Sequence, residues 1–165
     1  MKAPLAYNPI QKIPRTLFYK SSYREGYNII ATDVKKKIGI IYAQPRKVGY
    51  LNFLEVDFLG IRESERRKGY GTDAINFAKN MSKKLGCEGR VILTADITPF
   101  EKDIAPHPFY RKNGFTCNNK ILLKKIDNSI KNKKEMMFKD VQPAVMFYIP
   151  KKENFFDKIK KYFKK

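Results

Sequence analysis

The sequence contains no tryptophan, one histidine and two cysteines. No metal-ligand spacing surrounds Cys87 or Cys117, so we predict no metal site and two free thiols in a reducing compartment. The single histidine, His107, forms no recognisable nucleophile–base arrangement with either cysteine or with Ser64. Covalent catalysis is therefore disfavoured, and His107 is interpreted as a structural residue, with a role as base or cofactor contact as the alternative.

Long apolar runs are also missing. No segment reaches the roughly 18 apolar residues that a membrane span requires, and the first residues lack the apolar centre of a secretory signal. The chain of 165 residues is 42% hydrophobic and 13% aromatic, which is a globular composition. We therefore expect a cytoplasmic protein made of a single domain, residues 1–165.

Acidic residues are scarce, because 16 Asp and Glu stand against 35 Lys and Arg and give a formal charge of +19. Such a charge favours contact with a polyanion, for example RNA, DNA, an acidic protein or a membrane surface. The excess of lysine over arginine and the abundance of asparagine and isoleucine are alternatively what an AT-rich genome produces. In both cases the field of the protein would attract an anionic cofactor.

The spacing of apolar residues predicts a mixed α/β fold. Strands are expected at 27–32, 37–44, 50–59, 90–96 and 144–149, and helices at 72–85, 106–113 and 120–133. The first two strands should form a hairpin, whereas 50–59 and 90–96 should be parallel because a helix connects them. The core is expected at 27–115, followed by an inserted segment at 116–142 and a basic amphipathic tail helix within 151–165.

The turn RRKGYGT, residues 66–72, places two glycines and three cations where the helix 72–85 should begin. The first N–H groups of a helix have no internal partners and carry partial positive charge. Gly69 and Gly71 would let a ligand approach the backbone closely, so the pattern predicts a cradle for a phosphate or diphosphate. It is neither a P-loop nor a Rossmann fingerprint, and a glycine-rich turn with surface charges is the alternative.

Two segments resemble one enzyme family. Arg66-x-x-Gly69-x-Gly71 resembles the acetyl-CoA signature R/Q-x-x-G-x-G/A of the GNAT N-acetyltransferases, and FYRKNGF at 109–115 resembles the F-Y-x-K-x-G-F segment that closes their cofactor site. The resemblance implies a mixed central sheet with antiparallel N-terminal strands and splayed parallel central strands. It also implies transfer of acetyl from acetyl-CoA (coenzyme A) to a primary amine by direct attack.

The resemblance assigns cofactor contacts residue by residue. Amides of the turn would meet the diphosphate, and backbone near Leu59 and Ile61 would pair with the pantetheine like an added strand. The predicted cofactor-binding residues are Leu59, Ile61, Arg66, Arg67, Lys68, Gly69, Tyr70, Gly71, Thr72 and Phe109.

Three side chains are candidates for the chemistry. Tyr110 matches the family tyrosine that donates a proton to the coenzyme A sulfur; packing against the cofactor without a chemical role is the alternative. Glu55 matches the glutamate that protein-acetylating members use as a base, and Asp57 would share its strand face and assist. Phe58 is expected on the opposite face, with Val56. For the acids, acceptor binding or a surface position is the alternative.

The acceptor stays open between a small amine, a protein amine and an aminoacyl group on tRNA. The family usually has two acceptor-holding helices after its first strand, whereas here only 26 residues with three prolines precede position 27. A catalytically silent module of the same fold that binds polyanions is the rival function.

The tail, residues 151–165, is expected to dock its aromatic face on the domain or on a second subunit in a homodimer. Contact with a polyanion or a membrane surface is the alternative. The residues of that face are Phe155, Phe156, Ile159, Tyr162 and Phe163.

Overall fold

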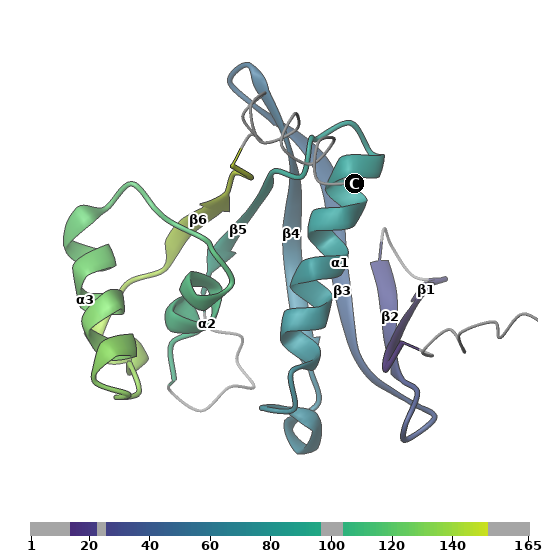
Figure 1. The fold of residues 1–165 in the computed structure, drawn as a ribbon. Coiled ribbons are helices and arrows are strands. Elements are labelled where there is room, and N and C mark those ends of the chain that lie inside the picture. The colour runs from purple at the N-terminus through teal and green to yellow at the C-terminus, as the bar shows by residue number, and fades with distance from the viewer. Residues whose placement is uncertain (1–13, 23–25, 97–103, 152–165) are drawn as a thin grey trace, which may run out of the picture.

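The computed structural model describes residues 14–22, 26–96 and 104–151, which form a single six-stranded sheet with helices packed against it (Figure 1). The strands, adjacent in chain order, are β1 (Thr16–Lys20), β2 (Gly26–Ala31), β3 (Lys36–Val48), β4 (Leu51–Ile61), β5 (Val91–Ala95) and β6 (Ala144–Tyr148). The helices are α1 (Tyr70–Lys84), α2 (His107–Lys112) and α3 (Lys120–Lys131), with 3-10 turns η1 (Glu63–Glu65) and η2 (Phe138–Asp140).

The sheet is antiparallel except for one pair. Strands β1 to β4 pair antiparallel in succession, β4 and β5 are parallel, and β5 and β6 are antiparallel. The predicted mixed sheet with antiparallel first strands is therefore confirmed. The sequence analysis does not predict β1, because TLFYK is too short to show a strand alternation by itself and is held by its register against β2.

The two central strands separate after a short contact. β4 and β5 pair only over Leu54–Val56 and Val91–Leu93. Beyond these residues β4 stays paired with β3 as far as Ile61, while β5 stays paired with β6 as far as Ala95. The strands diverge toward the end of the sheet at which α1 begins (Figure 1), so the predicted splay is confirmed.

A bulge in β4 changes which side chains share a face. The register with β3 shifts so that Val56 pairs with Ala43 and Phe58 pairs with Tyr42, leaving Asp57 as the extra residue. Because neighbouring residues of β3 point to opposite faces, Phe58 lies opposite Val56, and the expectation that these two share a face is wrong. The rings of Phe58 and Tyr42 lie 5.9 Å apart, centroid to centroid.

Helix α1 lies across one face of the sheet (Figure 1). Ala74, Ile75 and Ala78 are fully or almost fully buried at helical spacing. On the same side Phe77 stacks on Phe18 of β1, with ring centroids 4.0 Å apart. These contacts bury the apolar stripe from which the helix was predicted.

A glycine in the left-handed conformation lies at each end of α1. The helix begins two residues earlier than predicted, at Tyr70, because Gly69 with φ of 88° serves as its N-cap. Gly71 and Thr72 therefore belong to the first helical turn. At the other end Gly86, with φ of 76°, follows the C-cap Leu85, as expected for a helix that stops at a left-handed residue.

The segment after β5 supplies the remaining helices. The helix predicted at 106–113 is α2, and the helix predicted at 120–133 is α3, which begins where the Asn119 side chain accepts a hydrogen bond from the Leu122 amide at 3.0 Å. The predicted tail helix lies in 152–165, outside the described residues. Among the described helices none is long and apolar enough to cross a membrane.

Candidate functional site

The connection from β4 to α1 forms a turn whose backbone is partly left-handed. Arg67 has φ of 62° and Gly69 has φ of 88°. No side chain caps the first turn of α1. Since the first N–H groups of a helix lack partners within it, this end presents amides and partial positive charge. The turn lies at the end of the sheet where β4 and β5 separate (Figure 1).

The three cations of the turn have partners within the protein. Arg66 donates from Nε to the Ile61 carbonyl at 3.0 Å, which ties the turn to the end of β4. Arg67 donates to Glu135 at 2.8 Å, and Lys68 donates to Glu65 at 2.9 Å. The turn is thus held in shape by the residues that the sequence assigns to the cofactor.

Glu65 is the buried acid of this turn. It is 4% exposed, and its carboxylate oxygens form ion pairs with Lys68 Nζ at 2.9 Å and with Lys36 Nζ of β3 at 3.1 Å. The hydrogen bonds from Lys68 and Lys36 hold the pKa of Glu65 below its usual value, although burial acts in the opposite direction. The sequence analysis misses Glu65 because nothing in its spacing indicates burial.

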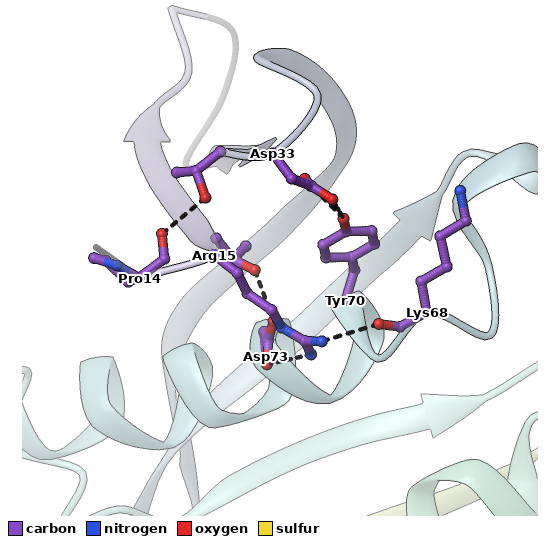
Figure 2. Close-up of polar contacts among 8 residues, drawn as sticks. Pro14, Arg15, Asp33, Lys68, Tyr70 and Asp73 are labelled. Carbon is purple, nitrogen blue, oxygen red and sulfur yellow. Dashed lines mark hydrogen bonds and ion pairs between the residues drawn. The ribbon is translucent and has the colours of Figure 1, made fainter. Parts of the chain in front are cut away.

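The Tyr70 side chain is taken up by an internal hydrogen bond. It is 4% exposed, and its hydroxyl donates to the Asp33 carboxylate in the β2–β3 turn at 3.0 Å (Figure 2). Burial and the Asp33 hydrogen bond raise the pKa of this phenol. Only the backbone of Tyr70 is left for a ligand. Thr72, by contrast, is exposed in the first turn of α1.

Phe109 and Gly71 meet where α2 approaches α1. A Cβ built on Gly71 would lie 3.1 Å from the Phe109 ring, so the glycine makes room for this aromatic side chain. Lys79 of α1 strengthens the approach, because its Nζ donates to the Asn113 carbonyl at 2.7 Å and lies 3.9 Å from the Tyr148 ring centroid. Burial lowers the pKa of Lys79. Sequence reasoning gives no signal for Lys79.

Tyr110 follows Phe109 on α2 and is half-buried. Its ring packs between those of Phe109 and Phe115, with centroid distances of 5.1 and 5.9 Å. Tyr110 thus lies on α2, the helix whose Phe109 contacts Gly71 in the first turn of α1. Leu59 and Ile61, the residues predicted to meet pantetheine, are half-buried in the part of β4 that lies beyond its last pair with β5.

Glu55 and Asp57 lie on either side of the point where the central strands part. Glu55 is half-buried and accepts a hydrogen bond from Arg46 of β3, whereas Asp57 is exposed and accepts from Gln44 Nε2 at 3.0 Å. Partial burial and the negative charge of Glu55 raise the pKa of Asp57, and Gln44 and Arg46 offset this in part. The Glu55 charge therefore acts on Asp57, but the two acids are not buried together, and their roles as base and assistant stay predictions.

His107 begins α2 and is fully buried. Its ring lies 6.1 Å from that of Phe138, centroid to centroid, in the interior of the segment after β5. Burial lowers the pKa of His107, with partial compensation from the Gln142 backbone and from Asp96. His107 is thus an interior residue of this segment, and its role stays a prediction. Both cysteines are buried free thiols.

No metal site is apparent in the described part of the chain, since no cluster of three or more potential ligand side chains occurs there. A pocket of about 660 Å³ lies between α3 and β6 and includes Asn119, Lys125 and Phe147. It involves none of the predicted site residues.

Comparison with known proteins places this geometry in a family. The sequence model of a protein family described as the acetyltransferase (GNAT) domain matches residues 24–117 of the chain. A comparison with curated proteins gave no match.

Solved structures similar to this chain include several acetyltransferases. A structure described as a streptothricin acetyltransferase of Bacillus anthracis with acetyl coenzyme A has a TM-score of 0.51 at 15% identity, covering 90% of this chain and 70% of the other. The NatC complex bound to Gag peptide and CoA has a TM-score of 0.50 at 10% identity, with 76% and 71% covered. Naa50 of Arabidopsis thaliana with a bisubstrate analogue has a TM-score of 0.47 at 19% identity, with 77% and 74% covered. The family model spans more than half of the chain and the sheet shares the fold, so the chain belongs to the GNAT acetyltransferase family.

Proposed function

We propose that the protein transfers an acetyl group from acetyl-CoA to a primary amine. One observation carries this proposal: β4 and β5 separate after Val56 and Leu93, at the same end of the sheet where α1 begins with a left-handed glycine. An elongated ligand with a diphosphate could lie with its charge on the helix start and its body in the opening between the strands. Structures of the same fold hold acetyl-CoA or CoA, which supports this ligand.

The residues of the turn fit the diphosphate. Amides from Arg67 to Thr72 present N–H groups at the positive end of α1, and the surrounding cations add attraction. The strand segment 57–61 has no β5 partner among the described residues, so its backbone at Leu59 and Ile61 can pair with the pantetheine amides as an added strand would. Phe109 would then line the opening beside Gly71.

The chemistry requires one proton donor and one route for removing a proton. Acetyl-CoA supplies the acetyl group as a thioester. Tyr110 would donate its phenol proton to the departing thiolate, so that coenzyme A leaves as a thiol. Glu55, assisted by Asp57, is placed on the strand that leads into the turn and would take the ammonium proton of the acceptor through water.

The acceptor is a primary amine of a small molecule, a protein or an aminoacyl-tRNA. A coenzyme A release assay across amines, peptides and charged tRNAs tests the function and identifies the class. We expect release above the hydrolysis background with at least one acceptor class. If no acceptor releases CoA, and if RNA but not acetyl-CoA raises the melting temperature, the silent polyanion-binding module is the correct reading.

Two further expectations concern the surroundings of the enzyme. The cytoplasmic location stays a prediction from composition. The homodimer depends on docking of the tail, so removal of residues 151–165 with measurement of solubility and oligomeric state tests it, whereas the polyanion contact concerns the basic surface as a whole. An unchanged oligomer and unchanged solubility would argue against docking of the tail.

A further inference from the structure

The start of α1 is connected to the beginning of the described chain by a cluster of polar contacts (Figure 2). Its centre is an ion pair between Arg15, just before β1, and Asp73 in the first turn of α1. These residues are 58 positions apart in sequence, and no motif of the family resemblance includes either of them. The pair is therefore a feature of this chain that the proposed mechanism does not use.

The Arg15 guanidinium contacts the turn from three directions. Its Nε and Nη2 donate to the two Asp73 carboxylate oxygens at 2.8 and 3.0 Å. Its Nη1 donates to the Lys68 carbonyl at 3.1 Å, and its Cζ lies 5.4 Å from the centroid of the Tyr70 ring. A Cβ on Gly69 would lie only 2.5 Å from Nη2, so the guanidinium is packed directly against this left-handed glycine.

Two more side chains hold the same end of α1. The Thr16 hydroxyl donates to Asp73 at 2.6 Å, and Tyr70 donates to Asp33. Burial would raise the pKa of Asp73, but the hydrogen bonds from Arg15 and Thr16 hold it below the usual value. Asp73 is therefore ionised at neutral pH, and its charge lies in the first turn of a helix whose amides are proposed to bind an anion.

An uncompensated carboxylate at this place would repel a diphosphate. Arg15 neutralises Asp73 and, through the Lys68 carbonyl, fixes the peptide that joins Lys68 to the left-handed Gly69. We propose that Arg15 and Asp73 act together as positioning residues that hold the turn 66–72 in its cofactor-binding geometry. This inference rests on the proposed function, because it concerns the affinity of the same site for coenzyme A.

The proposal differs from the simpler idea that Arg15 contacts the phosphates directly. If Arg15 were a direct ligand, Asp73 would compete for it, and Asp73→Asn would free the guanidinium and tighten binding. If the pair positions the turn, Asp73→Asn loses the bidentate contact and weakens binding, as Arg15→Ala does, and this loss outweighs the removal of a negative charge near the diphosphate. The sign of the Asp73→Asn effect therefore separates the two roles.

The experiment is calorimetric titration of coenzyme A into the full chain and its variants. We expect the dissociation constant to rise at least about fivefold in Arg15→Ala and in Asp73→Asn, which corresponds to about 1 kcal/mol of binding free energy. The double variant should be no weaker than the more affected single variant, because both changes remove the same pair. With an active acceptor, the KM for acetyl-CoA should rise while kcat at saturation is kept.

The chain offers a matched control. Arg111 of α2 and Asp127 of α3 also form a bidentate pair, at 2.8 and 3.2 Å, outside the turn. Asp127→Asn should keep the wild-type affinity for coenzyme A. Arg15→Lys, which keeps the charge but not the fork geometry, serves as the milder variant if Arg15→Ala does not fold, and it too should bind more weakly.

The outcomes distinguish failure of the positioning role from failure of the proposed function. Wild-type affinity in Arg15→Lys and Asp73→Asn, or tighter binding by Asp73→Asn, would overturn the positioning role and leave the proposed function intact. An equal loss of affinity in Asp127→Asn would also overturn it, because the effect would then be one of general stability. A wild-type protein that does not bind coenzyme A would overturn the proposed function itself.

Discussion

The Phe109 ring lies against Gly71, where a side-chain Cβ would come within 3.1 Å of it. This contact joins the two segments that carry the family resemblance, since Gly71 belongs to the turn and Phe109 to the FYRKNGF segment. The glycine at this position therefore has two roles in the account. It leaves the backbone open to a ligand and lets α2 approach α1 closely enough to bring Tyr110 near the site.

Gly71→Val should disturb both roles. The branched side chain would displace the Phe109 ring, and we expect a loss of roughly 1–3 kcal/mol in the free energy of unfolding, typical of overpacking. Acetyl-CoA should then no longer raise the melting temperature. In the double variant Gly71→Val/Phe109→Ala, the steric conflict is relieved, so part of the lost stability should return without cofactor binding. Normal stabilisation of Gly71→Val by acetyl-CoA would contradict this assignment.

Tyr110→Phe removes the hydroxyl and keeps the packing between Phe109 and Phe115. We expect kcat to fall by about 10²-fold or more, the range of general acid catalysis, while the affinity for coenzyme A is retained. Steady-state kinetics and calorimetry check the two parts separately. Tyr19→Phe, an exposed tyrosine of β1, is the control and should be silent. An unchanged kcat would remove Tyr110 from the mechanism.

Glu55→Gln should lower the rate of transfer near neutral pH, and raising the pH should restore part of it, because solvent then removes the acceptor's proton in place of the missing base. The pH dependence of kcat/KM in wild type and variant gives the test. Glu88→Gln is a matched control, since Glu88 is likewise a carboxylate paired with an arginine, Arg90, at 2.7 Å. Parallel pH profiles for wild type and Glu55→Gln would show that Glu55 is not the base.

Asp57→Asn should slightly stabilise the fold at neutral pH. Because the pKa of Asp57 is raised, the folded state loses stability as this carboxyl ionises with rising pH, and the neutral amide avoids that loss. The gain should be within about 0.5 kcal/mol for a surface group and should disappear toward pH 3, where Asp57 is protonated in both states.

Urea unfolding at the two pH values measures this difference, with Asp127→Asn as the control of opposite sign. The hydrogen bond from Arg111 lowers the pKa of Asp127, so that its ionised form stabilises the folded state and its removal should cost stability at neutral pH. A destabilised Asp57→Asn at neutral pH would contradict the proposed repulsion between Asp57 and Glu55.

The spacing of apolar residues predicts those elements whose apolar residues are buried in the core. Strand β5 and helix α1 follow directly from apolar spacing, and the parallel pairing of β4 and β5 follows from the helix between them. Strand β1 could not be found in this way, because its order comes from pairing with β2 rather than from a pattern of its own. The bulge at Asp57 likewise depends on the register against β3, which a single strand does not encode.

The same distinction between local patterns and long-range contacts applies to the residues of the candidate site. The turn and Tyr110 were accessible because they lie in contiguous motifs. The partners that hold them were not, since Arg15 meets Asp73 across 58 residues and Lys79 meets the Asn113 carbonyl across 34. Tyr70 belongs to the motif, yet its side chain bonds Asp33. A motif thus located the backbone of the site but not the direction of each side chain.

The central claim is that the amides at the start of α1 bind the diphosphate of acetyl-CoA. A crystal structure of the protein with coenzyme A tests it most directly. We expect the diphosphate within hydrogen-bond distance of the backbone between Arg67 and Thr72, with the sulfur facing the Tyr110 hydroxyl. A complex in which the diphosphate lies elsewhere, or in which Tyr110 points away from the sulfur, would contradict it.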